Sequence, residues 1–168
     1  MALNDINLNP VNIEKLYGNF LLEKAKSSTA SNTIITANES LPFLGQNLKS
    51  VIILVNQKDA KYLLEEELDF LTSILSACYY SIADVAIINC KHTNAELFDQ
   101  IKATFSIKSI ILFNVNMASV GFPLTIPNYQ VQLYDNLKLL AAPDLLSIKK
   151  DKAEKNGLWT SLKKLFEI

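Results

Sequence analysis

Short apolar runs alternate with longer amphipathic segments through the middle of the chain. The run Val51–Val55 contains only aliphatic residues, and continuous runs of this kind are typical of strands buried on both faces of a parallel sheet. Similar runs predict strands over 84–90 and 107–113. Between them, apolar residues recur at helical spacing over 60–79 and 94–105. This order of strands and helices implies parallel pairing through right-handed crossovers.

The C-terminal part of the chain continues the alternation with weaker signals. Two shorter runs predict strands over 129–133 and 137–141, and 143–148 is expected to form a helical turn. Residues 114–123 are expected to form a loop or short helix, and an apolar stripe over 152–166 predicts a terminal helix. The sequence therefore predicts an α/β fold: a three-layer sandwich with a central parallel sheet of about four strands between helical layers.

An amphipathic helix is predicted near the N-terminus, over 9–24, and a polar loop follows over 26–40. We therefore divide the chain into an N-terminal helix and loop, 1–47, and an α/β domain, 48–168. The helix has one apolar stripe, which either binds a partner or packs on its own domain. This candidate partner face consists of Ile13, Leu16, Tyr17 and Phe20.

The composition is that of one globular domain. The chain has 168 residues, of which 49% are hydrophobic and 20% charged, so it is long enough to bury a core without disulfides or metals. The net charge is −1 and every basic residue is lysine. Because arginine is the preferred residue for bidentate recognition of phosphate and guanine, these features argue against a sequence-specific DNA-binding protein.

Lysine is in excess over acidic residues in the C-terminal third. This bias predicts weak contact with nucleic-acid phosphates, or else only a lysine-bearing outer face of the terminal helix. The lysines concerned are Lys149, Lys150, Lys152 and Lys155. The N-terminus has no basic segment followed by an apolar one, and no apolar run approaches the length of a bilayer span. We therefore expect a cytoplasmic protein with no membrane contact.

The chain has few candidates for metal or acid–base chemistry. Cys78 and Cys90 lie in apolar runs at a spacing that fits no zinc motif, so we expect buried free thiols and no metal or other cofactor. The only histidine, His92, has no nucleophile or carboxylate placed beside it by any motif, and we expect it to lie in a solvated loop. The acidic run 65–67 with Asp69 points in several directions from a helix and is also expected to be solvated.

The loops after the strands contain the candidate site, because ligands of parallel sheets bind beyond the carboxyl ends of the strands. Asparagine side chains there have the groups to bind a base edge or a peptide, although turn formation explains them equally well. Asp59 is expected to cap the following helix rather than to act as a base. The candidate pocket consists of Asn56, Gln57, Asp59, Asn114, Asn116, Ala142, Pro143 and Asp144.

The C-terminal third resembles a known family. The strand ending near Ala142 is followed by Pro143 and a Leu-Leu pair, then by a lysine-bearing stretch, 149–155, and a helix containing Trp159. This order resembles the closing stretch of the uracil-DNA glycosylase superfamily, in which a strand ends in a His-Pro-Ser or His-Pro-Ala motif. The similarity extends loosely over 48–165 and implies a uracil-DNA glycosylase-like fold.

The departures from that family concern its catalytic residues. Ala142 occupies the position of the family's histidine, and residues 56–59 replace the Gly-Glu or Gly-Gln motif that positions the attacking water. Uracil excision needs both a positioned water and stabilisation of the developing negative charge. We therefore expect no glycosylase activity and no catalytic residues.

One branch of this fold, the psi subunit of bacterial DNA polymerase III, is similar in size and also lacks the catalytic residues. The resemblance implies a non-catalytic interaction domain that binds a chi-like or clamp-loader subunit, with the N-terminal helix as the contact. The alternative is a nucleotide- or nucleobase-binding protein, or an enzyme that uses the strand-end loops without a familiar motif.

Overall fold

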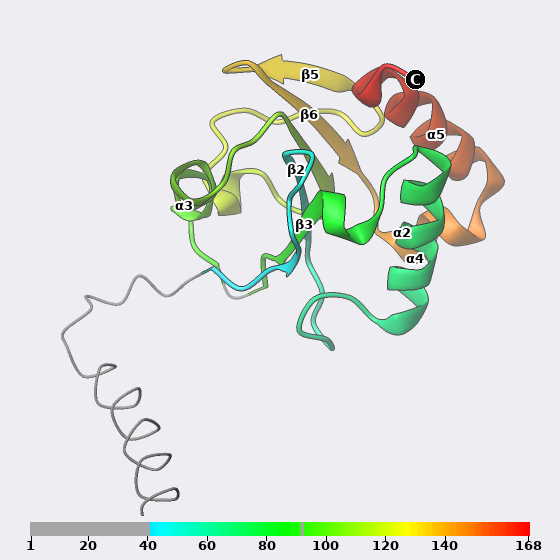
Figure 1. Cartoon of the computed structure of the whole chain (residues 1–168), viewed down its shortest axis with the longest axis horizontal. Coiled ribbons are helices and arrows are strands. Elements are labelled where there is room, and N and C mark those ends of the chain that lie inside the picture. The colour runs from blue at the N-terminus through cyan, green and yellow to red at the C-terminus, as the bar shows by residue number, and fades with distance from the viewer. Residues whose placement is uncertain (1–40, 92) are drawn as a thin grey trace, which may run out of the picture. The chain divides into compact units, whose positions relative to one another are not determined.

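The α/β part of the chain is built on one six-stranded sheet with the strand order β1-β3-β2-β4-β6-β5. Figure 1 shows this sheet with α3 on one side and α2 and α5 on the other. The structure is a computed structural model and describes residues 41–91 and 93–168. The four middle strands are parallel, whereas the edge strands β1 and β5 run antiparallel to their neighbours. The strands are β1 Leu44–Gly45, β2 Val51–Val55, β3 Val85–Asn89, β4 Ser109–Phe113, β5 Val131–Tyr134 and β6 Leu137–Ala142.

Four α-helices and two 3-10 turns lie between and after these strands in the described part of the chain. The predicted α/β alternation is confirmed, and β2 and α5 have their predicted limits. The 114–123 segment contains a short 3-10 turn, as expected. The helices are α2 Glu65–Ala77, α3 Leu97–Thr104, α4 Leu145–Lys150 and α5 Lys152–Phe166, and the turns are η3 Ile82–Asp84 and η4 Ala118–Val120.

The sheet is larger and less uniform than the predicted parallel sheet of about four strands. Its parallel core, β3-β2-β4-β6, does have four strands. The hairpin β5–β6 adds an antiparallel edge, because Asp135 and Asn136 both take left-handed conformations, with φ of 51° and 62°, as a type I′ hairpin turn requires. The weak strand predicted over 129–133 is therefore an edge strand and not part of the parallel core.

The other edge strand, β1, comes from the segment that precedes residue 48. It pairs with β3 through Leu44 and Gly45, and Gly45 has a φ of 108°. A Cβ at Gly45 would lie 2.1 Å from the carbonyl oxygen of Val85. Only glycine allows both this conformation and this close approach of two backbones.

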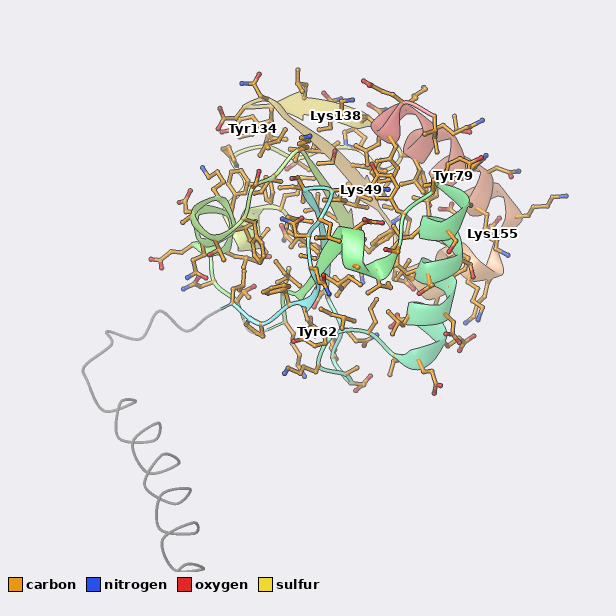
Figure 2. All side chains as sticks on the ribbon, in the orientation of Figure 1. Lys49, Tyr62, Tyr79, Tyr134, Lys138 and Lys155 are labelled. Carbon is orange, nitrogen blue, oxygen red and sulfur yellow. The ribbon has the colours of Figure 1, made fainter. Side chains whose placement is uncertain are left out.

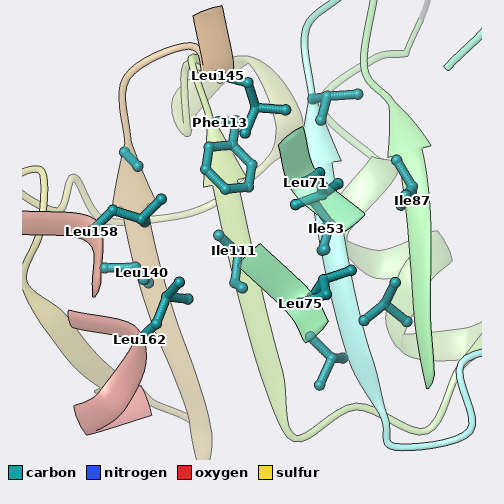
Figure 3. Packing of buried hydrophobic residues seen from close by; sticks show 14 of the residues in the cluster. Ile53, Leu71, Leu75, Ile87, Ile111, Phe113, Leu140, Leu145, Leu158 and Leu162 are labelled. Carbon is teal, nitrogen blue, oxygen red and sulfur yellow. The ribbon is translucent and has the colours of Figure 1, made fainter. Parts of the chain in front are cut away.

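One face of the sheet packs against α2, α4 and α5. Ile53, Ile111 and Leu140 come from three adjacent parallel strands and are at most 1% exposed. Figure 3 shows these side chains meeting the helices. Full burial of one such side chain contributes about 1.5–3 kcal/mol, so the cluster holds the three helices on this face. Its helix members include Leu71, Leu75, Leu158 and Leu162.

The opposite face packs against α3 and the segment between β4 and β5. The alternate strand residues Ile52, Leu54, Ile110 and Leu112 form a second buried cluster with Leu97, Phe98, Ile101 and Phe122. Successive strand residues point to opposite faces of a sheet. Because both faces are covered, every residue of β2 and β4 is buried, which explains their continuous apolar sequence.

The N-terminal predictions lie outside the described residues. They are the helix 9–24, the loop 26–40 and the candidate partner face Ile13, Leu16, Tyr17 and Phe20. They stay predictions, as does the solvated position expected for His92, which is also outside the described residues.

Candidate functional site

The chain order of the parallel strands creates a switch point between β2 and β4. From β2 the chain crosses first to β3 on one side and later to β4 on the other. In open α/β sheets, ligands bind in the crevice at such a point, beyond the carboxyl ends of the strands. Asn56 and Asn114 directly follow β2 and β4, so they mark where a binding site is expected.

A pocket of about 510 Å³ lies at this position. It extends from the ends of β2 and β4 to the end of β6, and Thr125 and Asn128 from the segment before β5 contribute to its lining. The structure thus brings together most of the candidate pocket predicted from the sequence. The predicted residues that line it are Asn56, Asn114, Asn116, Ala142, Pro143 and Asp144.

Backbone contacts position two of the asparagines. Asn114 has a left-handed conformation with a φ of 52°, and its N–H donates to the carbonyl oxygen of Ala142 at 2.9 Å. This bond ties the end of β4 to the end of β6. The Oδ1 of Asn116 accepts from the N–H of Ala118 at 3.0 Å, so Asn116 forms a turn at the start of η4, as asparagine commonly does.

Gln57 and Asp59 lie outside the main pocket. The Nε2 of Gln57 donates to Oε2 of Glu67 at 2.5 Å, and its Oε1 accepts from the N–H of Lys58 at 2.8 Å. Gln57 lines a second cavity, of about 20 Å³, that shares three lining residues with the main pocket. Asp59 is exposed and lines neither cavity.

Two predictions about the start of α2 are wrong: that Glu67 is solvated and that Asp59 caps the helix. Glu67 belongs to the acidic run that we expected to be solvated, yet it is only 5% exposed. Its Oε2 also accepts from the N–H of Leu64 at 3.1 Å, so it satisfies a backbone donor at the start of α2. Asp59 does not cap this helix, because α2 begins at Glu65 rather than at residue 60.

Asn89, at the end of β3, holds the loop between β2 and α2. Its Oδ1 accepts from the N–H groups of Gln57 and Lys91, both at 3.1 Å. Its Nδ2 donates to the carbonyl oxygens of Gln57, Ala60 and Lys61 at 2.9, 3.1 and 3.2 Å. These bonds hold residues 60 and 61 outside the helix. The only sequence signal for Asn89 is its place at the end of a predicted strand.

Ala142 and Asp144, at the end of β6 and just after it, are buried or make structural hydrogen bonds. Ala142 is 2% exposed. Asp144 caps α4, with Oδ1 accepting from the N–H of Ser147 at 2.9 Å and Oδ2 accepting from its Oγ at 2.6 Å. Partial burial raises the pKa of Asp144, but the hydrogen bonds from Ser147 and from nearby backbone N–H groups together outweigh it and hold this pKa below its ordinary value of 3.8. The carboxylate is therefore ionised at neutral pH.

The lining of the main pocket is rich in amides. It contains four asparagines and a threonine but no lysine. The side chains of Asn56, Asn114 and Asn128 are exposed and have no hydrogen-bond partner among the described residues. Each amide offers both donors and an acceptor. Such a lining suits an uncharged ligand with donors and acceptors on one edge better than it suits an anion.

The cysteines are free and form no reactive pair. Cys78 is buried, as predicted, and Cys90 is partly buried. Burial raises the pKa of both thiols, that of Cys90 to about 12, so neither is a thiolate nucleophile at neutral pH. Among residues 41–91 and 93–168, no three His, Cys, Asp or Glu side chains are grouped to hold a metal ion.

The four lysines singled out from the sequence lie on α4 and at the start of α5. Lys149 forms an ion pair with Glu66, with Nζ and Oε1 2.7 Å apart, which links α4 to α2. Lys150, Lys152 and Lys155 are exposed. Three of the four ammonium groups are thus available to a partner at the surface.

No family model matches this chain, and no curated protein matches it either. Within the part of the chain that the structure describes, no helix has both the length and the apolar character needed to cross a membrane. We therefore infer function from the pocket and the surface of this chain.

Proposed function

We propose that this chain is a non-catalytic interaction domain on a uracil-DNA glycosylase-like scaffold, with a role like that of the psi subunit of bacterial DNA polymerase III. Its partner is then a chi-like or clamp-loader subunit. The main support is a single residue of the pocket lining, Ala142. It occupies the position that the resemblance assigns to a catalytic histidine. The proposed contact face is the N-terminal stripe of Ile13, Leu16, Tyr17 and Phe20.

The acidic side chains near the pocket either make structural contacts or lie outside it, which supports a non-catalytic role. Asp144 caps α4, Glu67 is buried against Gln57 and the start of α2, and Asp59 lies outside the pocket. A general base must reach the proton that it removes, directly or through one water. None of these three carboxylates is arranged for that task at the main pocket.

Two features of the fold support the glycosylase-like scaffold. The chain passes from β6 through Pro143 directly into α4 and then α5, which is the order on which the resemblance rests. Buried clusters on both faces of the sheet also fit the predicted three-layer sandwich.

Affinity capture with the tagged full chain, followed by mass spectrometry, tests the proposed partner. Wild-type protein should recover clamp-loader subunits from the host lysate, and the triple variant Leu16→Ala, Tyr17→Ala and Phe20→Ala should lose them. Leu133→Ala is the matched control, because it removes an apolar side chain that is 71% exposed on β5. The proposal fails if wild type and triple variant recover the same proteins, or if neither recovers a clamp-loader subunit.

Incubation with uracil-containing single-stranded DNA tests the absence of glycosylase chemistry. We expect no abasic sites above background. Excision that disappears in Asn56→Ala would contradict the proposal, since that variant removes an exposed amide of the pocket lining.

A second candidate function is nucleobase binding, which the amide-rich lining favours. The exposed amides of Asn56, Asn114 and Asn128 surround one pocket of about 510 Å³, and pockets of this size hold small organic ligands. Paired donors and acceptors on an amide match those on the edge of a base.

Calorimetric titration with the free bases and nucleosides tests this second candidate. Binding should weaken roughly five- to 100-fold in Asn56→Ala, because a polar group left unpaired in a binding site costs about 1–3 kcal/mol. Asn156→Ala, an exposed change on α5, is the matched control. Binding that is equal in all three proteins would exclude this pocket.

A further inference from the structure

One flank of α5 carries an exposed tryptophan between lysines. Lys152, Lys155, Trp159 and Lys163 lie within roughly 80° of one another around the helix, and all four are exposed. We call these four residues the lysine–tryptophan stripe. Trp159 is 37% exposed, and the Nζ of Lys163 lies 5.9 Å from its ring centroid. Figure 2 shows Lys155 extending away from the body of the protein.

The acidic residues near the stripe are directed elsewhere. The side chain of Asp151 accepts hydrogen bonds from the N–H groups at the start of α5, and Glu154 accepts one from the hydroxyl of Tyr129. Glu66, on the neighbouring helix α2, is paired with Lys149. In the described part of the chain, no ion pair includes a lysine of the stripe. The positive charges of the stripe are therefore free to act together.

We propose that the lysine–tryptophan stripe binds single-stranded nucleic acid, with the lysines on phosphates and a base stacked on Trp159. This inference is independent of the protein partner and of the pocket ligand proposed above. It keeps Lys152 and Lys155 of the predicted lysine contact and adds Trp159 and Lys163. It leaves out Lys149, which is paired with Glu66, and Lys150, which lies on α4.

The combination of charge and aromatic ring favours a single strand over other polyanions. Proteins that bind single strands combine a positive surface with aromatic side chains on which bases stack. Lys155 and Lys163 stand roughly 12 Å apart along the helix, with Trp159 midway, so two phosphates and the base between them fit one contact. In a duplex the faces of the bases are stacked on one another and cannot reach Trp159, and an acidic peptide has no bases to stack. Because lysine acts as a point charge and not as a planar fork, we expect little sequence preference.

The intrinsic fluorescence of the full chain reports on this contact directly, because Trp159 is the only tryptophan. The protein is titrated with a short single-stranded oligothymidine at low ionic strength and then at increasing salt. We expect quenching of the emission and a log–log salt dependence of the affinity that reflects phosphate neutralisation.

Charge reversal and removal of the ring separate the two parts of the contact. The double variant Lys155→Glu and Lys163→Glu should weaken binding at least roughly tenfold and reduce the salt slope by about 0.7 for each lysine. Trp159→Ala, followed with a labelled oligonucleotide, should weaken binding roughly five- to 100-fold. Lys102→Glu is the matched control, because α3 packs on the opposite face of the sheet from α5. This variant should bind as wild type does. Circular dichroism confirms that each variant is folded.

Several outcomes would overturn the proposal. They are an absence of salt-dependent quenching, wild-type binding by the folded double variant, and equal weakening by Lys102→Glu. Binding of a duplex, of polyglutamate or of vesicles of anionic phospholipid with the same or higher affinity and the same quenching would also exclude a single strand as the ligand. Quenching by oligothymidine that is lost in the double variant and retained in Lys102→Glu would support it.

Discussion

The side chain of Asn89 is bonded to both backbone groups of Gln57. Its Oδ1 accepts from the N–H of Gln57 at 3.1 Å, and its Nδ2 donates to the carbonyl oxygen of Gln57 at 2.9 Å. An asparagine at the end of β3 thereby closes the end of β2, the neighbouring strand. Because Asn56 precedes Gln57 and lines the pocket, this contact also supports one wall of the candidate site.

Asn89→Ala should destabilise the protein by about 1–3 kcal/mol, because it leaves partly buried backbone donors and acceptors of the loop without partners. Asn89→Asp keeps the acceptor oxygen but turns a carboxylate oxygen toward the carbonyl oxygens of Gln57, Ala60 and Lys61, so it should also destabilise the protein. Urea unfolding followed by circular dichroism measures the difference. Gln132→Ala, at an exposed position of β5, is the control and should change the free energy of unfolding by less than about 0.5 kcal/mol. Equal stability of Asn89→Ala and wild type would contradict a structural role for this contact.

Asp84 should contribute pH-dependent stability. The N–H of Ser81 donates to its Oδ2 at 2.7 Å, and this bond, together with the Ser81 hydroxyl and Lys49, holds the pKa of Asp84 below its ordinary value of 3.8 despite desolvation. A carboxyl whose pKa is lower in the folded state stabilises the fold above its ordinary pKa, and the contribution disappears as the pH falls through the folded pKa.

The free energies of unfolding of wild type and Asp84→Asn, measured from neutral pH downwards, check this expectation. Their difference should be constant at neutral pH and shrink below about pH 4. Asp69→Asn, on the exposed face of α2, serves as the control for loss of a surface charge. A difference that grows on acidification would show that the sign is wrong.

Two glycines should respond in opposite directions to alanine. Gly121 has a φ of 88°, and a Cβ there would lie 2.0 Å from the carbonyl oxygen of Ala95, so Gly121→Ala should destabilise by at least about 1–2 kcal/mol. Gly157 lies inside α5, where a Cβ would meet the ring of Tyr129 at 3.4 Å. Gly157→Ala should stabilise by about 0.5–1 kcal/mol. Thermal unfolding of both variants measures the contrast, and a stabilised Gly121→Ala would refute the close approach of Gly121 to the carbonyl oxygen of Ala95.

Both thiols should be unreactive in the native protein. Cys78 is buried, and burial raises the pKa of Cys90 to about 12, so little thiolate exists at mildly alkaline pH. Iodoacetamide should label neither residue in the folded protein and both in urea, as measured by mass spectrometry. Fast labelling of Cys90 without denaturant would mean that its surroundings open readily.

Local pattern was sufficient to place the central elements. The aliphatic run of β2 and the apolar stripe of α5 each correspond to one element with the predicted limits. A strand buried on both faces has a continuous apolar run and a helix buried on one face has an apolar stripe, so both patterns can be recognised in the sequence. The same logic brought Asn56 and Asn114 together, since neighbouring parallel strands end at the same edge of a sheet. The sequence by itself therefore determined the α/β class and the position of the pocket at the strand ends, where most of the predicted candidate residues line it.

Only the tertiary structure decided the contacts that shape the loop beside this pocket and the edges of the sheet. Asn89 bonds to Gln57 across 32 positions of the chain, and Glu67 is buried because Gln57 reaches it from the end of β2. The antiparallel pairing of β5 follows from the turn at 135–136. No periodicity encodes such contacts, because each depends on which distant segments the fold places side by side.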